Sequence, residues 1–232
     1  RKDCRRRSTA TDKVWTAGMV VIGDEILSGR THDKNPHDIH PTADIHPSAV
    51  LDGQVTVGAY TRVDAGTVLT GNVTIGHHTL IRCNTTVRGN VSIGNYTHIY
   101  DNVCIEGGRP ASLWSTTNEE RDEATIGDYC WVNHGATMHG TTMADRSAVH
   151  LNAACDYNTR LEEGAVLASG SVTNVNQVIP ANCFAEGVPA VVKEEDITDE
   201  DRKAYFGLIP EEWARSSGEW AEELVRKKGK QV

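Results

Sequence analysis

The stretch from Ile39 to Ile105, whose middle reads LTGNVTIGHHTLIRCNTTVRGNVSIG (residues 69–94), decides the fold of this chain. An aliphatic residue returns at every sixth position across it: Ile39, Ile45, Leu51, Val57, Val63, Leu69, Ile75, Ile81, Val87, Ile93, Ile99 and Ile105. Gly58, Gly76 and Gly94 each follow such a residue, at intervals of 18, so three six-residue steps make one repeating unit. A period of six fits no helix and indicates short strands joined by corners.

The pattern is that of the left-handed parallel β-helix of hexapeptide-repeat proteins, a triangular prism with 18-residue coils, and the handedness rests on this resemblance. Small residues at the corners let the backbone turn while the aliphatic side chain points to the axis. The register breaks once, at the polar residues 107–125, and the repeat resumes at Ile126, Val132 and Met138. After Met138 the spacing shortens by one residue, and the repeat continues at Met143, Val149, Cys155, Leu161, Leu167, Thr173 and Ile179. The sequence therefore predicts a mainly β protein.

We expect three regions: an N-terminal extension at 1–37, the β-helix at 38–192 with an excursion loop at 107–125, and C-terminal helices at 193–232. The first helix should be capped by Thr198 and the second should begin at Pro210, because both are typical N-terminal residues. An apolar face of the second helix, which must be buried against the prism or a neighbouring chain, comprises Trp213, Trp220 and Leu224.

The extension contains GDEILSGRT at residues 23–31, a string that resembles the opening strand and loop of the molybdopterin-binding family. A domain of that family needs a complete α/β core, and here the hexads follow almost at once, so we do not expect its site to be assembled. The first residues, RKDCRRRST, have the Arg- and Ser-bearing composition of an organellar transit peptide remnant.

Composition excludes some classes of function. The net charge of −9 argues against nucleic-acid binding, which depends on clustered Lys and Arg. No apolar run approaches the roughly 18 residues of a membrane span, so the chain should have no transmembrane segment of its own. Six scattered cysteines without a C-x-x-C pair indicate free thiols in a reducing compartment.

The ten histidines raise the question of a metal site. His134 and His139 stand apart because they follow the excursion, whereas His40, His46, His77 and His78 are expected at surface corners. Five residues of strand span up to roughly 16 Å, which places the pair on successive sides of the prism and too far apart for one metal within one chain. In a threefold trimer each interface could take one histidine from each neighbour, so this spacing favours inter-subunit sites.

A resemblance to the gamma-class carbonic anhydrases covers about residues 38–200 and is carried by Thr86–Asn90, His98–Asn102 and Asn133–Gly140. It implies a trimer with zinc at the subunit interfaces, held by three histidines, two from one chain and one from its neighbour. His134 and His139 match the second and third ligands, and Glu106 occupies the position of the first. Arg88 and Asp101 match a pair that supports the trimer between subunits.

Departures from the family pattern gather at the same place. Asn90 stands where the family has aspartate, and Tyr100 stands where it has a glutamine that helps to position the zinc-bound water. A carboxylate ligand such as Glu106 adds negative charge to the metal, which should raise the pKa of bound water and weaken the supply of hydroxide. We therefore expect no efficient hydration of CO2.

These observations lead to one principal hypothesis and two alternatives. The resemblance implies a catalytically impaired, structural subunit in a trimer or heterotrimer of homologous chains, bound to membrane-arm subunits of respiratory complex I on the matrix side of the mitochondrial inner membrane. The first alternative is an active zinc-dependent carbonic anhydrase. The second is a hexapeptide-repeat acyltransferase, with a histidine base and coenzyme A bound between chains.

Overall fold

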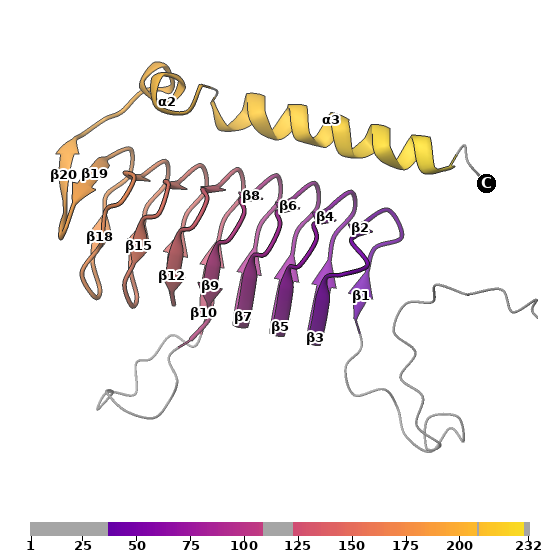
Figure 1. The fold of residues 1–232 in the computed structure, drawn as a ribbon. Coiled ribbons are helices and arrows are strands. Elements are labelled where there is room, and N and C mark those ends of the chain that lie inside the picture. The colour runs from indigo at the N-terminus through magenta and orange to yellow at the C-terminus, as the bar shows by residue number, and fades with distance from the viewer. Residues whose placement is uncertain (1–36, 109–122, 208, 230–232) are drawn as a thin grey trace, which may run out of the picture. The chain divides into compact units, whose positions relative to one another are not determined.

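The structure, a computed structural model, describes residues 37–108, 123–207 and 209–229, and these form a solenoid of parallel strands with two helices beside it (Figure 1). Eleven strands make the first sheet: β1 (Asp38–Ile39), β3 (Val50–Val57), β5 (Val68–Ile75), β7 (Thr86–Ile93), β9 (Cys104–Glu106), β10 (Glu123–Ile126), β12 (Thr137–His139), β13 (Thr142–Met143), β15 (Ala154–Cys155), β16 (Arg160–Leu161) and β18 (Val178–Ile179). Nine make the second: β2 (Asp44–Ile45), β4 (Arg62–Val63), β6 (Leu80–Ile81), β8 (His98–Ile99), β11 (Trp131–Val132), β14 (Ala148–Val149), β17 (Val166–Leu167), β19 (Phe184–Gly187) and β20 (Ala190–Glu194). The predicted mainly β solenoid is confirmed.

The aliphatic repeat forms the core. From Val57 to Ile105 every residue of the repeat is at most 2% exposed, and the same holds from Ile126 to Ile179. The first three, Ile39, Ile45 and Leu51, are partly buried and pack against this core. One inward residue per short strand is thus enough to fill the prism.

Strand register confirms the coil length and its two changes. Leu69 pairs with Val87 and Val87 with Ile105, at intervals of 18. Across the excursion Ile105 pairs with Met138, at an interval of 33. The following coil pairs Met138 with Cys155, at an interval of 17, which is the predicted shortening by one residue.

The long strands β3, β5 and β7 bend at glycines. Gly53, Gly71 and Gly89 have φ values of 92°, 101° and 87°, which glycine adopts without strain. A Cβ atom at any of them would collide with a carbonyl oxygen of the next coil. These glycines therefore make the corner that separates the two sides of the first sheet.

A ladder of buried threonines supports another corner. The hydroxyl of Thr79 donates a hydrogen bond to the carbonyl oxygen of Gly94 at 2.7 Å and accepts one from the backbone N–H of Thr97 at 3.2 Å. Thr61 and Thr97 make the corresponding bonds one coil away on each side. Each buried hydroxyl is thus satisfied and links neighbouring coils.

Helices α2 (Asp199–Phe206) and α3 (Pro210–Gly229) follow the solenoid, as predicted. Thr198 caps α2: its hydroxyl accepts from the backbone N–H of Asp201, whose side chain accepts from the backbone N–H of Thr198. Arg202 is 2% exposed and donates to the carbonyl oxygen of Gly164 at 2.5 Å, which anchors α2 to the prism. The side chains of the predicted apolar face of α3 lie outside the described residues.

The N-terminal extension and most of the excursion loop also lie outside the described residues, so their predicted roles stay predictions. Neither described helix is long and apolar enough to cross a membrane. Among the described cysteines, Cys83, Cys104, Cys130, Cys155 and Cys183 form no disulfide.

Candidate functional site

Arg88, Glu106 and His139 lie side by side on three successive coils. Glu106 on β9 pairs in register with Arg88 on β7 and with His139 on β12. Its Oε2 atom lies 3.1 Å from Nη2 of Arg88 and 3.4 Å from Nδ1 of His139. One carboxylate oxygen is therefore shared by a guanidinium group and an imidazole ring.

His139 is held on its other side by an aromatic ring. The ring of Tyr157, one coil further on, meets the His139 ring edge-on at 5.0 Å between ring centres. The His139 side chain is 32% exposed, so the imidazole remains accessible from outside the chain. The ring thus has a neighbour on each side, although its Nδ1 atom forms no hydrogen bond to a described residue.

His134 belongs to a second group at another corner. Its Nδ1 atom lies 3.1 Å from Oδ2 of Asp101, while Oδ1 of Asp101 accepts a hydrogen bond from the backbone N–H of Cys83 at 3.0 Å. Orienting Nδ1 in this way directs Nε2 away from the carboxylate. The His134 side chain is 47% exposed, which leaves it available to a neighbour.

Aromatic rings connect this second group to the helices. The Tyr100 ring lies 4.7 Å from that of His134 and stacks on Trp131 at 5.4 Å. Trp131 in turn contacts Phe206, the last residue of α2, at 5.5 Å. Tyr100, which stands where the resembling family has a glutamine, thus packs against His134, the candidate zinc ligand.

The five predicted site residues therefore form two groups. Glu106, His139 and Arg88 meet on the first sheet. His134 and Asp101 meet at the corner that follows strands β11 and β8 of the second sheet. Among the residues that the structure describes, no three His, Cys, Asp or Glu side chains are placed to hold one metal ion. Arg88 and Asp101, predicted to pair between subunits, contact Glu106 and His134 within the chain.

Sequence reasoning missed the ion pair between Arg88 and Glu106. The signal was present, because the two residues are 18 positions apart and so occupy the same place in consecutive coils. The contact between His139 and Glu106 was harder to predict. Residues 107–125 separate the two in the sequence, and the sequence does not show where the next coil resumes relative to Glu106.

Comparison with known proteins identifies the fold. No family model matches the sequence, and no curated protein matches it. Among solved structures, a putative acetyltransferase from Bacillus cereus is 22% identical, with a TM-score of 0.55 over 78% of this chain and 92% of the other.

Two further structures agree. A hexapeptide transferase family protein from Anaplasma phagocytophilum is 18% identical over 84% of this chain and 98% of the other, with a TM-score of 0.53. The UDP-N-acetylglucosamine acyltransferase of Francisella novicida is 19% identical over 84% and 85%, with a TM-score of 0.51. The chain thus has the left-handed β-helix fold of hexapeptide-repeat proteins, and identities this low show the fold alone.

Proposed function

We propose that this chain is a gamma-carbonic-anhydrase-like subunit of a three-chain assembly, in which Glu106 leaves the inter-subunit site catalytically impaired. The observation that carries the proposal is the division of the site residues between two corners of the prism. Glu106 and His139 are neighbours, and His134 is apart from both. A ligand set of two residues from one chain and one from the next requires this division.

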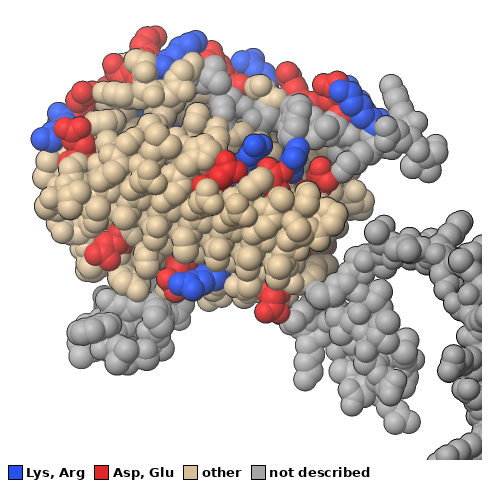
Figure 2. Space-filling model, in the orientation of Figure 1, with Lys and Arg blue, Asp and Glu red and all other residues tan. Residues whose placement is uncertain are grey.

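The chain's surface supports association with other chains. Figure 2 shows that Lys, Arg, Asp and Glu gather over α2 and α3, whereas the side of the prism in view is mostly uncharged. Interfaces between proteins are depleted of charged residues at their centres. Both His134 and His139 are partly exposed, as residues completing a shared site must be before assembly.

The donor set fits zinc poorly. The Glu106 oxygen that faces His139 already contacts the guanidinium group of Arg88, 3.1 Å away. A dication bound there would compete with that contact and would be repelled by the arginine. Two imidazole rings and a carboxylate engaged in this way are a weaker set than the three neutral histidines of the resembling family, so the assembly role is favoured over hydration of CO2.

The test compares the purified chain with its Glu106→His variant, measuring zinc content per chain and the rate of CO2 hydration. We expect neither stoichiometric zinc nor hydration for the wild type. The variant completes the three-histidine set and should gain zinc, and His134→Ala in that background should remove it. His46→Ala, an exposed corner histidine, is the matched control. Stoichiometric zinc and hydration in the wild type, both lost on His134→Ala, would overturn the impaired site.

The resemblance also supports a cellular role. We place the assembly on the membrane arm of respiratory complex I, on the matrix side of the mitochondrial inner membrane, together with homologous chains. Affinity purification of the tagged chain should recover complex I subunits in stoichiometric amounts. Recovery only as a free homotrimer would contradict this placement.

Acyl transfer is the second candidate, favoured by two histidine–carboxylate contacts, His139 with Glu106 and His134 with Asp101. Such a contact orients an imidazole ring for general-base catalysis. The candidate predicts binding of acetyl coenzyme A, measurable by calorimetry, and an acetyl-transfer rate that falls in His139→Ala. The assembly proposal predicts no such binding.

A further inference from the structure

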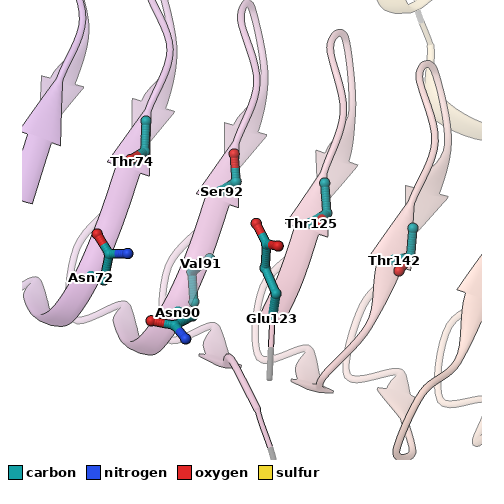
Figure 3. Close-up of a pocket in the computed structure, with 8 residues that line it drawn as sticks. All are labelled: Asn72, Thr74, Asn90, Val91, Ser92, Glu123, Thr125 and Thr142. Atoms are coloured by element: carbon teal, nitrogen blue, oxygen red, sulfur yellow. The ribbon is translucent and has the colours of Figure 1, made fainter. Parts of the chain in front are cut away.

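A polar hollow of about 500 Å³ lies on the outer side of the first sheet (Figure 3). Four parallel strands contribute to it: β5, β7, β10 and β13. Its volume falls within the range of about 300–1,000 Å³ that small-molecule sites occupy. The residues that line it are Asn72, Thr74, Asn90, Val91, Ser92, Glu123, Thr125 and Thr142.

The repeat arranges these residues in two parallel rows. In the first row Asn72, Asn90 and Glu123 pair in register, which puts two amides and a carboxylate in line. The second row is a line of hydroxyl groups from Thr74, Ser92, Thr125 and Thr142. Neighbouring members of each row are about 4.8 Å apart, the spacing of paired strands.

The chemistry of the lining defines the class of ligand. Every outward side chain can form hydrogen bonds, and Val91 contributes backbone only, because its side chain is buried in the core. Without a Lys or Arg in this lining, phosphate and carboxylate ligands have no counter-charge. An apolar ligand would desolvate amides and hydroxyls without replacing their hydrogen bonds.

Apart from Thr142, the outward side chains of this surface form no hydrogen bond to another described residue. Across the described ranges 37–108, 123–207 and 209–229, the side chains of Asn72, Asn90 and Glu123 make no hydrogen bond to another described residue. The same holds for the side chains of Thr74, Ser92 and Thr125. Outward polar groups elsewhere do bond along the stack: the Asp128 carboxylate accepts from the backbone N–H of Asn95 at 2.6 Å.

The hollow is separate from the histidine groups. Asn90 follows Gly89, the residue at which β7 turns the corner, so Asn90 and Arg88 face different sides of the prism. The helices do not contribute to the lining. The position at which Asn90 departs from the gamma-carbonic-anhydrase pattern thus lies in a hollow whose lining includes none of the five predicted site residues.

We propose that this hollow binds a neutral, polyhydroxylated ligand of about the size of a disaccharide. Amides and hydroxyls in two rows can donate to and accept from successive hydroxyl groups of a sugar ring. Glu123, whose carboxylate reaches over the hollow towards β7 in Figure 3, accepts from a pair of neighbouring hydroxyls. Its exposed single charge adds little affinity for cations.

The experiment titrates the ¹⁵N-labelled full chain with maltose and follows the side-chain amide resonances of Asn72 and Asn90. We expect saturable shifts of both. Asn90→Ala and Glu123→Ala should each weaken the affinity by roughly three- to tenfold, the effect of one neutral hydrogen bond. Gln54→Ala and Thr56→Ala are the matched controls, since they continue the same two rows on β3 outside the hollow and should leave the affinity unchanged.

Charged sugars distinguish the ligand class. Glucose 1-phosphate should bind more weakly than maltose because the lining has no cation. The proposal is overturned if maltose produces no saturable shift up to its solubility limit, if the control variants lose as much affinity as Asn90→Ala, or if glucosamine binds more than tenfold more tightly than maltose. None of these outcomes bears on zinc or on the assembly, so the two proposals fail separately.

Discussion

Thr79 illustrates how single polar residues hold the coils together. Its buried hydroxyl satisfies the carbonyl oxygen of Gly94 and the backbone N–H of Thr97. Thr79→Val keeps the shape but leaves both groups without that partner, so we expect a loss of about 2 kcal/mol in the free energy of unfolding, measured by urea denaturation. Thr74→Val, on the exposed side of β5, should change it by less than about 0.5 kcal/mol. Equal losses in both variants would contradict this role of the ladder.

Cysteine reactivity provides a second test at this scale. Burial raises the pKa of the Cys130 and Cys155 thiols to about 12. Because the thiolate is the reactive form, we expect both to resist iodoacetamide at pH 8 in the folded chain, while the partly exposed Cys83 and Cys104 are alkylated. Peptide mass spectrometry gives the order of labelling. Rapid labelling of Cys155 without unfolding would show that the core is open.

Individual contacts were the least predictable from sequence. The aliphatic repeat predicts which residues point inward, because burial follows the period. It does not indicate which partner a charged side chain selects at a corner. Glu106 was expected as a metal ligand, and in the chain it contacts Arg88 and His139. That choice depends on side-chain reach across coils, which periodicity does not encode.

At the scale of elements, helix α3 packs against one edge of the prism. A column of rings runs along that edge, in which His78 stacks on Tyr96 and Tyr96 on Tyr129, at 4.9 and 5.3 Å. Gly218 brings the helix backbone against His78 and Tyr96, where a Cβ atom would lie 3.2 and 3.4 Å from the rings. A glycine in mid-helix, unfavourable for helix formation, is thereby explained by close packing.

His78, which faces α3, predicts a pH dependence of the docking of this helix. Burial and the neighbouring His77 lower the pKa of His78, whereas Glu222 raises it. The net result is a pKa below its ordinary value of 6.5. A lowered pKa stabilises the docked state above pH 6.5, and this stabilisation is lost as the pH falls through 6.5 towards the docked-state value.

We therefore expect amide hydrogens of α3 to exchange faster at pH 5 than at pH 7.5, after correction for intrinsic exchange rates. Other described charged groups that line this groove are Glu219 and Arg215, which are exposed, and Glu211, which lies 2.7 Å from Arg146, and these should contribute little. His78→Phe should reduce the difference, and His40→Ala, at an exposed corner, should not. Equal protection of α3 at both pH values would refute the prediction.

The elements themselves were largely predictable. Thr198, the N-cap of α2, and Pro210, the first residue of α3, mark the starts of the two helices because their local chemistry suits helix N-termini regardless of tertiary contacts. The ring column, which also includes Tyr60 at 4.9 Å from the His78 ring, was not predicted, although Tyr60, His78 and Tyr96 are 18 residues apart. Stacking depends on φ values of 56°, 55° and 52° at these residues, a conformation that bulky side chains rarely adopt.

At the scale of the whole molecule, the separation of His134 from the Glu106–His139 pair predicts association. Light scattering should give about three times the 25.3 kDa chain mass, for the chain alone or with homologous chains. Asp101→Ala removes the contact that orients His134 and should weaken the assembly more than Asp52→Ala, an aspartate on an exposed part of β3. A monomer at micromolar concentrations, with homologous chains present, would contradict the proposed assembly.

The unchanged register across residues 107–125 has a consequence for how this architecture diversifies. Ile93 pairs with Ile126 and Ile105 with Met138, both at 33 residues instead of 18, so 15 additional residues do not change the register of the strands on either side. The coil tolerates an insertion at this corner, provided that Glu106 and Glu123 stay in register with Arg88 and Asn90 on β7. Replacing the excursion by a short linker, or by a foreign peptide, exchanges surface chemistry on a scaffold whose interior does not change.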